Sequence, residues 1–285
     1  MLLKIIIVIA CVILVYIIWQ WQELKKFART DYEIKSGKVQ REYKAAVLAD
    51  LHGFQYGKDN IPLLDAIRSG QPDLILIPGD MVVSRKSDTY ETALKILEEL
   101  CRIAPVYYSY GNHESRAHIR KSKYQEKFFA FENKVKELGI HVLHNETEAF
   151  GELAVTGLEI PLSCYKKGVD VPLPQDYLEK TLPEQTEDTF QVLLAHNPRY
   201  AKEYADWGAD LTLCGHNHGG LIRIPGVGSL ISPQFQWFPK YDAGAFDFEG
   251  KKVIVSRGLG THTFHIRIFN RAELVFMVIK PQDIA

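Results

Sequence analysis

Five short apolar runs along the chain each end at polar residues that bind metals or move protons. The run 74–77 is followed by Pro78, Gly79 and Asp80. Short apolar runs bounded by glycine and polar residues are typical of buried strands. The other four runs are 46–49 before Asp50 and His52, 105–110 before Asn112 and His113, 192–195 before His196, and 211–214 before His216 and His218. Ligands of layered α/β proteins bind beyond the carboxyl ends of strands, so we expect these five ends to converge on one site.

Three amphipathic segments, which follow the apolar runs 46–49, 74–77 and 105–110, predict helices. One is expected over 60–68, with Asn60 as its cap. A second is expected over 88–101, where Asp88 begins a stretch with capping-box spacing. A third, rich in lysine and phenylalanine, is expected over about 117–138. This alternation of strand and helix predicts a largely parallel sheet with helical layers.

The pattern changes after about residue 140. Further strands are predicted at 141–143, 153–158, 190–195, 253–256 and 266–279. They indicate a second sheet that packs on the first, with helices outside. The turn-rich stretch 161–189 interrupts these strands. It is either a lid or substrate-side loop, or a surface excursion without a role.

The amino-terminal segment 2–21 is apolar apart from Lys4 and Gln20, and it is long enough to cross the ~30 Å hydrocarbon core of a membrane. Trp19 and Trp21 suit a membrane interface. A cleaved signal peptide is the alternative, but no small-residue cleavage site follows the apolar run. The predicted organisation is a transmembrane anchor over 1–22, a connector over 23–43 and a catalytic domain over 44–285.

Composition and charge narrow the function classes. The 285 residues are 46% hydrophobic and 24% charged, which is typical of globular domains. The formal net charge of −1 gives no global field that attracts nucleic acid, so no specific nucleic-acid binding is expected. The 4 cysteines show neither a disulfide framework nor zinc-finger spacing. The sequence predicts a single-pass membrane protein. Because basic residues flank both ends of the apolar segment, it does not assign the catalytic domain to one side of the membrane.

The polar residues at the strand ends form a candidate metal-ligand set. Its members are Asp50, His52, Asp80, Asn112, His196, His216 and His218. Side chains two residues apart on an extended strand point the same way. We therefore expect this of the pair Asp50 and His52 and of the pair His216 and His218. Mixed imidazole and carboxylate ligands suit manganese, zinc or iron and poorly suit calcium. Two divalent ions ~3.5–4 Å apart, bridged by Asp80, would activate one water and favour an anionic substrate such as a phosphate ester.

Other polar residues have candidate roles beside the metals. His113 adjoins the ligand set, and a histidine in that position can protonate the leaving oxygen or stabilise the transition state. Arg223, Lys240 and Arg257 are candidate substrate contacts because their side chains donate well to phosphate, with surface salt bridging as the alternative.

The remaining histidines and two aromatic residues are expected to have mainly structural roles. His118, His141 and His144 fit no ligand position and are expected on the surface or in packing. His262 and His265 are left open, because the loop after Arg257 can approach the site. Trp237 and Phe238 are expected to pack under their loop, with contact to membrane or a lipid substrate as the alternative.

The same residues resemble the five motifs of the calcineurin-like metallophosphoesterases. The matching stretches are Asp50-x-His52, Gly79-Asp80, Gly111-Asn112-His113-Glu114, His196 and Gly215-His216-Asn217-His218. The resemblance implies a four-layer α/β/β/α sandwich. It also implies hydrolysis of a phosphate monoester, diester or pyrophosphate by attack of a metal-bridging hydroxide, with His113 as the acid. It assigns Asp50, His52, Asp80 and His218 to one metal, and Asp80, Asn112, His196 and His216 to the other.

Within that superfamily the chain is similar to the membrane-anchored bacterial branch called YkuE-like. The similarity lies in the anchor and in Gly219-Gly220, Arg223, 238–241 and 256–260. Related branches include enzymes that cleave a nucleotide-linked lipid precursor, so a lipid-linked substrate is one implied possibility. The residues that depart from the branch pattern are Leu221, Phe235, Trp237 and Ala272. They bear on the substrate and touch no predicted metal ligand.

Two other functions compete with hydrolysis. The first is a non-catalytic, membrane-tethered metal-binding scaffold, and the presence of every predicted ligand argues against it. The second is an iron-dependent redox protein, since histidine and carboxylate shells also hold iron. Asn112 as a neutral ligand and His113 as an acid suit hydrolysis better.

Overall fold

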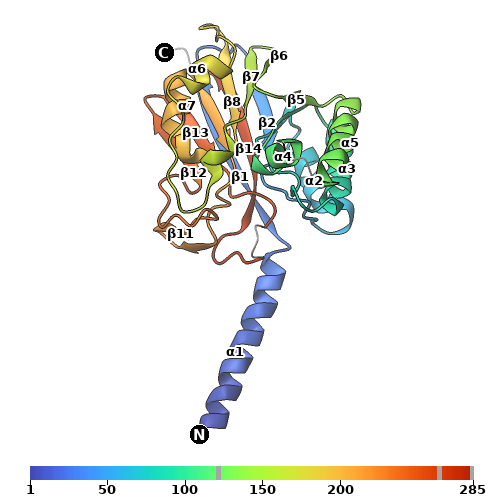
Figure 1. Cartoon of the computed structure of the whole chain (residues 1–285), viewed down its shortest axis with the longest axis vertical. Helices are drawn as coiled ribbons and strands as arrows, with labels where there is room; N and C mark the ends of the chain where they lie inside the picture. Colours follow the sequence, from blue (N-terminus) through green and yellow to red (C-terminus); the bar gives the residue numbers. More distant parts are fainter. Residues whose placement is uncertain (120–122, 262–264, 283–285) are drawn as a thin grey trace.

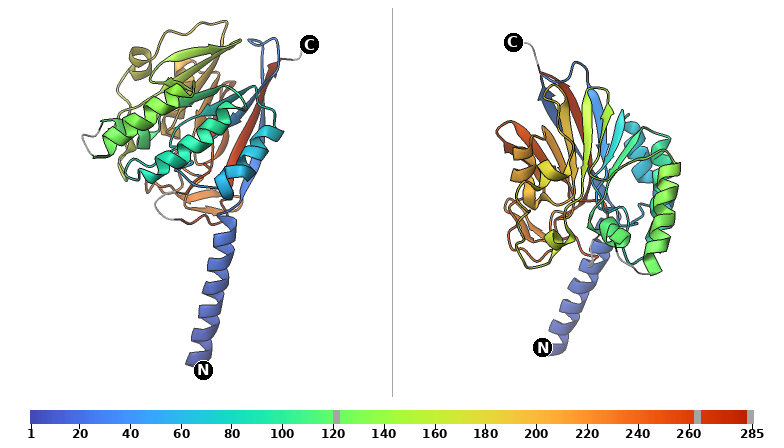
Figure 2. Two further views of the ribbon diagram at one scale, coloured as in Figure 1. Left: turned by 90° about the vertical axis from the view of Figure 1, so that its right-hand side faces the viewer. Right: turned by 45° about the horizontal axis from the view of Figure 1, so that its top comes forward.

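The apolar runs predicted as strands form two sheets that pack face to face in a computed structural model, which describes residues 1–119, 123–261 and 265–282. The first sheet has the order β1 (Phe27–Ser36), β14 (Ala272–Pro281), β2 (Tyr43–Val47), β3 (Leu74–Ile77), β4 (Val106–Ser109) and β5 (His141–Leu143). The second has the order β12 (Gly244–Phe248), β13 (Lys251–Val255), β9 (Leu211–Cys214), β8 (Phe190–Ala195), β7 (Leu153–Leu158) and β6 (Thr147–Phe150). Helices cover the outer faces of both sheets, which confirms the predicted four layers (Figures 1 and 2).

Helices on the two outer faces differ in length. The first sheet carries α2 (Ile61–Ser69), α3 (Asp88–Cys101), α4 (Asn112–Ile119) and α5 (Lys123–Glu137), whereas the second carries the shorter α6 (Tyr177–Thr181) and α7 (Ala201–Trp207). Short 3-10 turns lie at Lys58–Asn60, Leu162–Tyr165 and Pro198–Tyr200. The small hairpin of β10 (Ile222–Ile224) and β11 (Gly228–Ile231) lies at the lower end of the domain in Figure 1.

Parallel pairing brings the predicted strand ends to common edges. β2, β3, β4 and β5 are parallel neighbours, and so are β7, β8, β9 and β13. Such strands are covered on both faces, which explains their continuous apolar sequences. All four residues of β3 are buried, and so are all four of β4. Between the sheets, side chains such as Leu76 and Leu213 share one core.

The segment expected to be a connector contains a strand of the first sheet. β1 pairs in parallel with β14 from Phe27 opposite Ala272 to Ser36 opposite Pro281. Only Ile34 in β1 is buried, because the strand lies at the sheet edge. Its mainly polar sequence therefore resembles a linker although its backbone belongs to the sheet.

Several helix and strand boundaries differ from the sequence prediction. The expected helix over 117–138 corresponds to α4 and α5, and residues 120–122 lie outside the described part of the chain. Its start moves back to Asn112, directly after β4. The capping-box interpretation of Asp88 was wrong, because Asp88 is already helical and Ser87 precedes the helix. The expected strand 266–279 begins only at Ala272.

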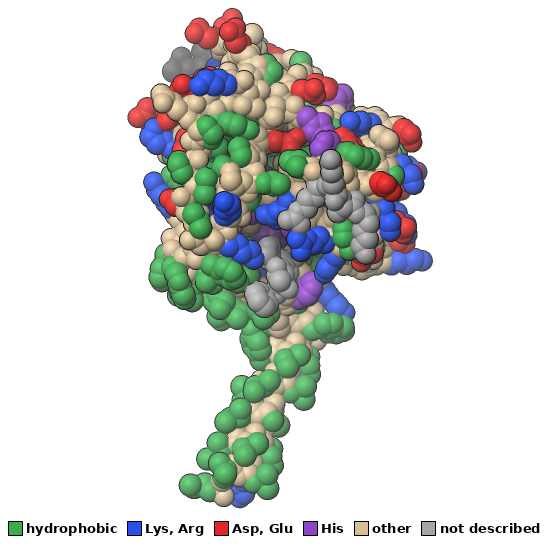
Figure 3. Space-filling model, viewed as in Figure 1, with side chains coloured by type: hydrophobic (Ala, Val, Ile, Leu, Met, Phe, Trp, Pro, Cys, Tyr) green, Lys and Arg blue, Asp and Glu red, His purple; other side chains and the backbone are tan. Residues whose placement is uncertain are grey.

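The amino-terminal helix α1 (Leu2–Glu23) projects from the domain (Figure 1). It carries hydrophobic side chains along its exposed length (Figure 3). The helix has 22 residues, and its most apolar part has a mean hydropathy of 3.0 and is fully unburied. It is therefore long and apolar enough to cross a membrane. A signal sequence near the amino terminus can meet the same criteria of length and composition.

Candidate metal centre

The seven predicted ligands converge where the carboxyl ends of the two sheets meet. All seven are buried, and His52 is the most exposed of them at 8%. Six of the seven, together with His113, form three groups whose ligand atoms lie within 4.8 Å of one another: Asp50, His52 and His218; His52, Asp80 and His113; and Asp80, His196 and His216. The convergence predicted from the strand ends is therefore present among the described residues.

Asp50 and Asp80 lie at the centre of these groups. Nε2 of His196 is 3.1 Å from Oδ2 of Asp80 and 3.7 Å from Oδ1 of Asp50. Nε2 of His218 is 3.5 Å from Oδ1 of Asp50, and Nε2 of His52 is 3.1 Å from Nε2 of His218. The imidazoles thus surround two carboxylates, which matches the donor chemistry of a site for divalent metals.

The backbone of these ligands is not the extended strand tip that their spacing suggested. Asp50, His52 and Asp80 have φ values of 53°, 52° and 57°, and His216 and His218 have 67° and 48°. Residues other than glycine seldom adopt this left-handed conformation, and it concentrates at functional sites. The side chains therefore meet because the chain turns sharply after each strand.

Neighbouring groups fix the ligand side chains. Nδ1 of His196 lies 2.7 Å from the carbonyl oxygen of Pro78. Because that carbonyl only accepts, Nδ1 carries a proton and Nε2 points to the centre, where it can bind a metal once it loses its own proton. The backbone N–H of His216 donates to both oxygens of Asp50 at 3.0 and 2.9 Å. Such contacts orient ligands before a metal binds.

The amide of Asn112 lies between His216 and Arg116. In its hydrogen-bonded orientation the nitrogen donates to Nδ1 of His216 at 2.8 Å, and the oxygen accepts from Arg116 at 2.9 Å. Coordination of a cation through the amide oxygen requires the opposite orientation of the amide. Either way, Asn112 lies beside His216, as the predicted ligand set requires.

Burial makes the charges of this cluster interdependent. Burial raises the pKa of Asp50 to about 7, against the opposing charge of His196. Burial also favours the neutral form of Asp80, but the charges of His196 and His113 outweigh it and hold the pKa of Asp80 well below its usual value. For His196, burial favours the neutral ring, yet Asp80 raises its pKa to about 9. Buried carboxylates of this kind need cationic partners, and divalent metals supply that charge.

His113 is held in a defined tautomer beside the ligands. The backbone N–H of Ser84 donates to Nδ1 of His113 at 3.1 Å, so the neutral ring carries its proton on Nε2. Burial lowers the pKa of His113, which favours this neutral form. Its ring lies 5.0 Å from that of His52 in an edge-to-face arrangement. His113 therefore has a proton on Nε2 to donate beside the predicted metals.

Glu114 has a role that its place in the sequence motif did not reveal. Its carboxylate accepts from the backbone N–H groups of Asp80 at 3.0 Å and Gly111 at 3.1 Å. It also accepts from Val82 N–H at 3.3 Å and from the Tyr108 hydroxyl at 2.7 Å. Burial, and then the charge of Asp80, raise the pKa of Glu114 to about 8, but four donors suit the ionised form. Glu114 thus ties the turn that bears Asp80 to the start of α4.

The stretch 161–189 contributes a side chain to the site. The ring of Tyr165 lies edge-on to His216, with centroids 5.0 Å apart, and Tyr165 is buried. Gly168 N–H donates to the carbonyl oxygen of Gln234 at 2.9 Å, which joins this stretch to a second loop. The sequence identified the stretch and its Tyr165, but not the contact of Tyr165 with His216, because contact across a loop leaves no periodic signal.

A cavity of about 320 Å³ adjoins His52 and His113. Lys86, Thr261 and His265 also line it. His265, which the sequence left open, therefore lies at the mouth of the site. His262 lies outside the described residues.

The predicted substrate contacts lie farther along the second-sheet loops. Nη1 of Arg223 is 2.9 Å from a carboxylate oxygen of Asp242, so this side chain forms a salt bridge. Arg257 packs over Gly219, where a Cβ would lie 3.0 Å from its Cγ. Lys240 is exposed. Substrate binding by these three residues stays a prediction.

The other histidines lie away from the ligand groups. His141 stacks on Tyr107 with ring centroids 4.5 Å apart, and His118 is 44% exposed. His144 contacts Glu159 through Nδ1 at 2.6 Å and Glu132 through Nε2 at 3.1 Å. Among the described residues, none of the three belongs to a metal-ligand group.

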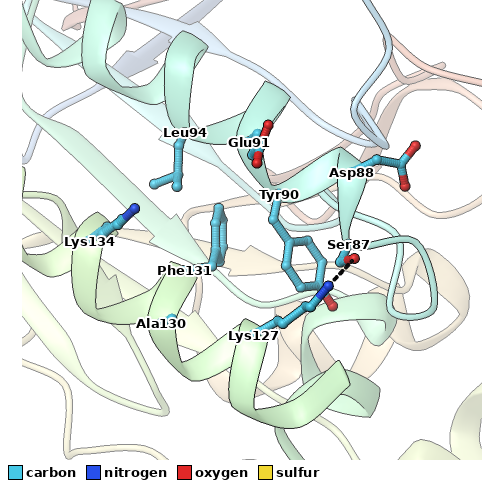
Figure 4. A pocket seen from close by; sticks show the side chains of 9 residues that line it. All are labelled: Ser87, Asp88, Tyr90, Glu91, Leu94, Lys127, Ala130, Phe131 and Lys134. Carbon is cyan, nitrogen blue, oxygen red and sulfur yellow. Dashed lines mark hydrogen bonds between the residues drawn. The ribbon is translucent and has the colours of Figure 1, made fainter. Parts of the chain in front are cut away.

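A separate pocket of about 400 Å³ lies between α3 and α5. Figure 4 shows Tyr90 and Phe131 at its base, with Lys127 and Lys134 beside them. None of the predicted ligands lines it, so this pocket is distinct from the metal centre.

Comparisons with known proteins find a family model and several relatives. The family model for calcineurin-like phosphoesterases matches residues 43–220. Phosphodiesterase YaeI of Escherichia coli (strain K12) is 30% identical over 247 residues, which cover 82% of this chain and 81% of YaeI. The uncharacterized metallophosphoesterase YkuE of Bacillus subtilis (strain 168) is 24% identical over 262 residues, which cover 89% of this chain and 86% of YkuE. Sulfate thiohydrolase SoxB of Thermus thermophilus, a solved structure, is 12% identical with a TM-score of 0.48 and covers 83% of this chain and 56% of its own.

The matched range begins at β2 and ends two residues after His218, so it contains every predicted metal ligand and His113. Similarity to YaeI and YkuE extends beyond this range over most of the chain. The chain belongs to the calcineurin-like phosphoesterase family, as its motifs predicted.

Proposed function

We propose that this chain is a membrane-anchored, dinuclear metal-dependent phosphoric ester hydrolase. The observation that carries the proposal is the convergence of seven buried residues with oxygen and nitrogen donors, centred on Asp50 and Asp80. The orientation of His196 by Pro78 supports it, because it points Nε2 of His196 to the centre, where it can bind a metal.

The donor set divides between two cations that share Asp80. Asp50, His52, Asp80 and His218 would hold one, and Asp80, Asn112, His196 and His216 the other. When bound, two such ions (manganese, zinc or iron) would supply an activated water and neutralise charge on the phosphate ester. The protein contributes fixed ligand orientations and a buried setting, in which electrostatic interactions are stronger than in water.

His113 acts on the leaving group in this proposal. Its Nδ1 accepts from Ser84, so its Nε2–H is the group that donates a hydrogen bond to the departing oxygen and stabilises the negative charge that develops there. A positioned donor of this kind contributes about 10²–10⁴-fold to such reactions. The backbone N–H of His113 donates to Asp80 and its ring accepts from Ser84, so its orientation is set before substrate arrives.

The proposed anchor is α1, and the proposed substrates are phosphate esters at the membrane surface. The side-chain amide of Gln20 donates to the carbonyl oxygen of Arg267 at 3.0 Å. The Arg267 guanidinium in turn donates to the carbonyl oxygen of Gly258, and a Cβ on Gly258 would lie 2.8 Å from the Cβ of Asp50. A short series of contacts therefore connects Asp50 in the metal centre to the base of α1. The name of YaeI makes phosphodiesters the class to test first, and lipid-linked esters or pyrophosphates follow from the anchor.

The test uses the full-length protein in detergent micelles, stripped of metal and reloaded with manganese, zinc or iron. We expect metal-dependent hydrolysis of bis-p-nitrophenyl phosphate, compared with p-nitrophenyl phosphate as the monoester. Asp80→Asn should lower turnover by about 1,000-fold or more, since a bridging carboxylate supports several kcal/mol of charge stabilisation. Asp65→Asn, at an exposed aspartate on α2, is the matched control and should leave turnover unchanged.

One outcome favours the non-catalytic scaffold instead. If two metal ions bind per chain but monoester, diester and lipid-linked pyrophosphate all remain intact, hydrolysis is excluded while metal binding stands. Oxygen consumption by the iron-loaded protein would favour the redox function.

A further inference from the structure

The end of the domain near α1 presents an exposed apolar surface. Figure 3 shows hydrophobic side chains gathered at the lower end of the domain, around the position of β11 in Figure 1. We call the following six residues the apolar rim: Ile224, Val227, Trp237, Phe238, Ile266 and Phe269. Their exposed fractions run from 39% for Ile224 to 67% for Val227 and Trp237. The expectation that Trp237 and Phe238 pack under their loop was therefore wrong.

Backbone contacts make the rim one continuous surface. Ile222, at the start of β10, forms a bridge with Ile268, which places the loop of Phe269 beside the hairpin. Ile231, at the end of β11, forms a bridge with Trp237. The hairpin, the loop that follows it and the more distant segment around Phe269 thus present their apolar side chains together. Contiguous exposed apolar surfaces mark interaction sites, whereas scattered apolar residues need no explanation.

The rim is joined to the end of α1. The ring of Trp19 lies 6.4 Å from that of Phe269, and Gln20 donates to the backbone of Arg267. Arg271 pairs with Glu23 at 2.6 Å. These contacts fix the direction of α1 relative to the domain. Since Trp19 lies at the depth of a membrane interface if α1 spans the bilayer, Phe269 lies at that depth as well.

The loop that bears the aromatic side chains has an unusual backbone. Phe238 has φ of 46°, and nearby Phe235 has φ of 62°. Large side chains seldom adopt this conformation, and here both are also exposed, at 60% and 48%. This backbone conformation costs energy, and because both side chains are exposed, no burial within the domain offsets that cost.

Cationic side chains lie directly behind the rim. A cavity of about 570 Å³ is lined by Arg223, Arg257 and Asp242 together with Ile224, Val227 and Phe269 of the rim, and Asp242 pairs with Arg223. Apolar and aromatic residues in front of basic ones are typical of surfaces that sit in the membrane interface, where the cations meet lipid phosphates.

We propose that the apolar rim lies in the interfacial layer of the same bilayer that α1 crosses, so that the domain rests on the membrane surface at two places. The proposal rests on α1 as the membrane anchor of the proposed function. Docking at the rim holds the loops after β9 and β13, and the metal centre that they adjoin, at the level of lipid phosphate groups.

The test places one fluorescent label at a time on the full-length protein in lipid vesicles. The environment-sensitive dye NBD is attached to Val227→Cys or Trp237→Cys in a background with Cys11→Ala and Cys101→Ala, because Cys164 and Cys214 are buried. Vesicles contain phosphatidylcholine and phosphatidylglycerol, with or without nitroxide-bearing lipid as a quencher. Lys180→Cys, 71% exposed on α6 at the far end of the domain, is the matched control.

A label on native Cys11 separates the docking from the anchor. We expect quenching by nitroxide lipid at Cys11, at 227 and at 237, and water-like emission at 180. Quenching at Cys11 alone would overturn the docking and leave the anchor standing. Absence of quenching at Cys11 would overturn the anchor and the docking with it. Blue-shifted emission at 227 and 237 without lipid quenching would mean that protein, such as a second copy of this chain, covers the rim, and would also overturn the proposal.

Discussion

The two sheets contribute to the metal centre in different ways. On the first sheet, Asp50, Asp80 and Asn112 each follow a buried strand within a few residues, and the buried carboxylate of Glu114 ties two of these turns together. On the second sheet, His196, His216 and His218 also follow strands closely, but long loops surround them. These loops supply Tyr165, Arg257 and the apolar rim.

This difference separates the turns that we expect to govern catalysis from the loops that we expect to govern access to substrate. The first half is a set of short, buried turns in which a displaced side chain would disturb a metal ligand directly. The second half adds exposed loops whose side chains reach the cavity mouth and the end of α1. We therefore expect substitutions in the first half to change catalysis and metal binding most, whereas those in the outer loops change which substrate is met and where.

The largest effect beyond the metal ligands is expected at His113. His113→Ala removes the Nε2–H donor and should lower turnover by about 10²–10⁴-fold. The loss should be greater for an alkyl phosphodiester than for a p-nitrophenyl ester, because the poorer leaving group depends more on a proton donor. Steady-state rates for both esters, with metal content measured in parallel, test this.

His118→Ala is the matched control for His113. Both residues lie on α4, but the His118 side chain is 44% exposed and belongs to no ligand group in the described chain. Equal losses for both esters in His113→Ala, with reduced metal content, would mean that His113 supports metal binding and does not serve as an acid.

The strand-end residues could be predicted from sequence because parallel strands give a local signal. A continuous apolar run such as 74–77 identifies a buried strand, and the polar residue after it must lie at the sheet edge. The left-handed turns at Asp50 and His216 could not be predicted, since they are imposed by contacts such as that between Asp50 and the N–H of His216. Convergence was thus predicted correctly while its backbone geometry was not.

Contacts between distant segments gave no comparable signal. β1 pairs with β14, which lies near the other end of the chain. Neither strand's own sequence shows this pairing, so the place of β1 in the sheet could not be predicted. The same holds for Tyr165 against His216 and for Trp19 against Phe269. These are the contacts of the second half and of the anchor, where loops rather than strand ends position the side chains.

Glu114→Gln should have an intermediate effect that belongs to the first half. The amide keeps the shape of the carboxylate, but its NH₂ group faces donors that the carboxylate accepts from. We expect metal affinity to fall about 10–100-fold through the displaced Asp80 turn. Metal titration of the stripped protein measures this, with the exposed Glu91→Gln as the control. Lower thermal stability with unchanged metal affinity would restrict Glu114 to a role in folding.

The smallest effect is expected where the two halves meet, at His144. Its ring joins Glu132 on α5 to Glu159, which follows β7 of the second sheet. Burial favours the neutral ring, but the hydrogen bonds with Glu132 and Glu159 raise the pKa of His144 from 6.5 to about 9. The hydrogen bond with His144 is the main cause that lowers the pKa of Glu132 from 4.5 to about 2.

The signs of these two shifts define a pH window. The raised pKa of His144 stabilises the fold fully below pH 6.5, and this stabilisation is lost as pH rises through about 9. The lowered pKa of Glu132 stabilises it fully above pH 4.5, and this is lost as pH falls through about 2. His144→Asn should therefore cost most between pH 4.5 and 6.5, by about 1–2 kcal/mol after allowance for solvent screening of this partly exposed ring. Thermal unfolding at pH 5.5 and 9.5 measures the difference.

His141→Asn is the control for this prediction. The contact of His141 on β5 with Glu148 on β6 also joins the two sheets, but these side chains are 38% and 43% exposed, against 28% for His144, and an exposed ion pair contributes little. The effect of His141→Asn on thermal unfolding should be smaller at pH 5.5. A His144→Asn cost that is the same at both pH values would mean that packing of the ring on Tyr110, at 4.4 Å, holds the halves together rather than its charge. Turnover should change little in either variant, because neither side chain touches the metal ligands; a large loss in His144→Asn would instead show that the alignment of the two halves governs catalysis.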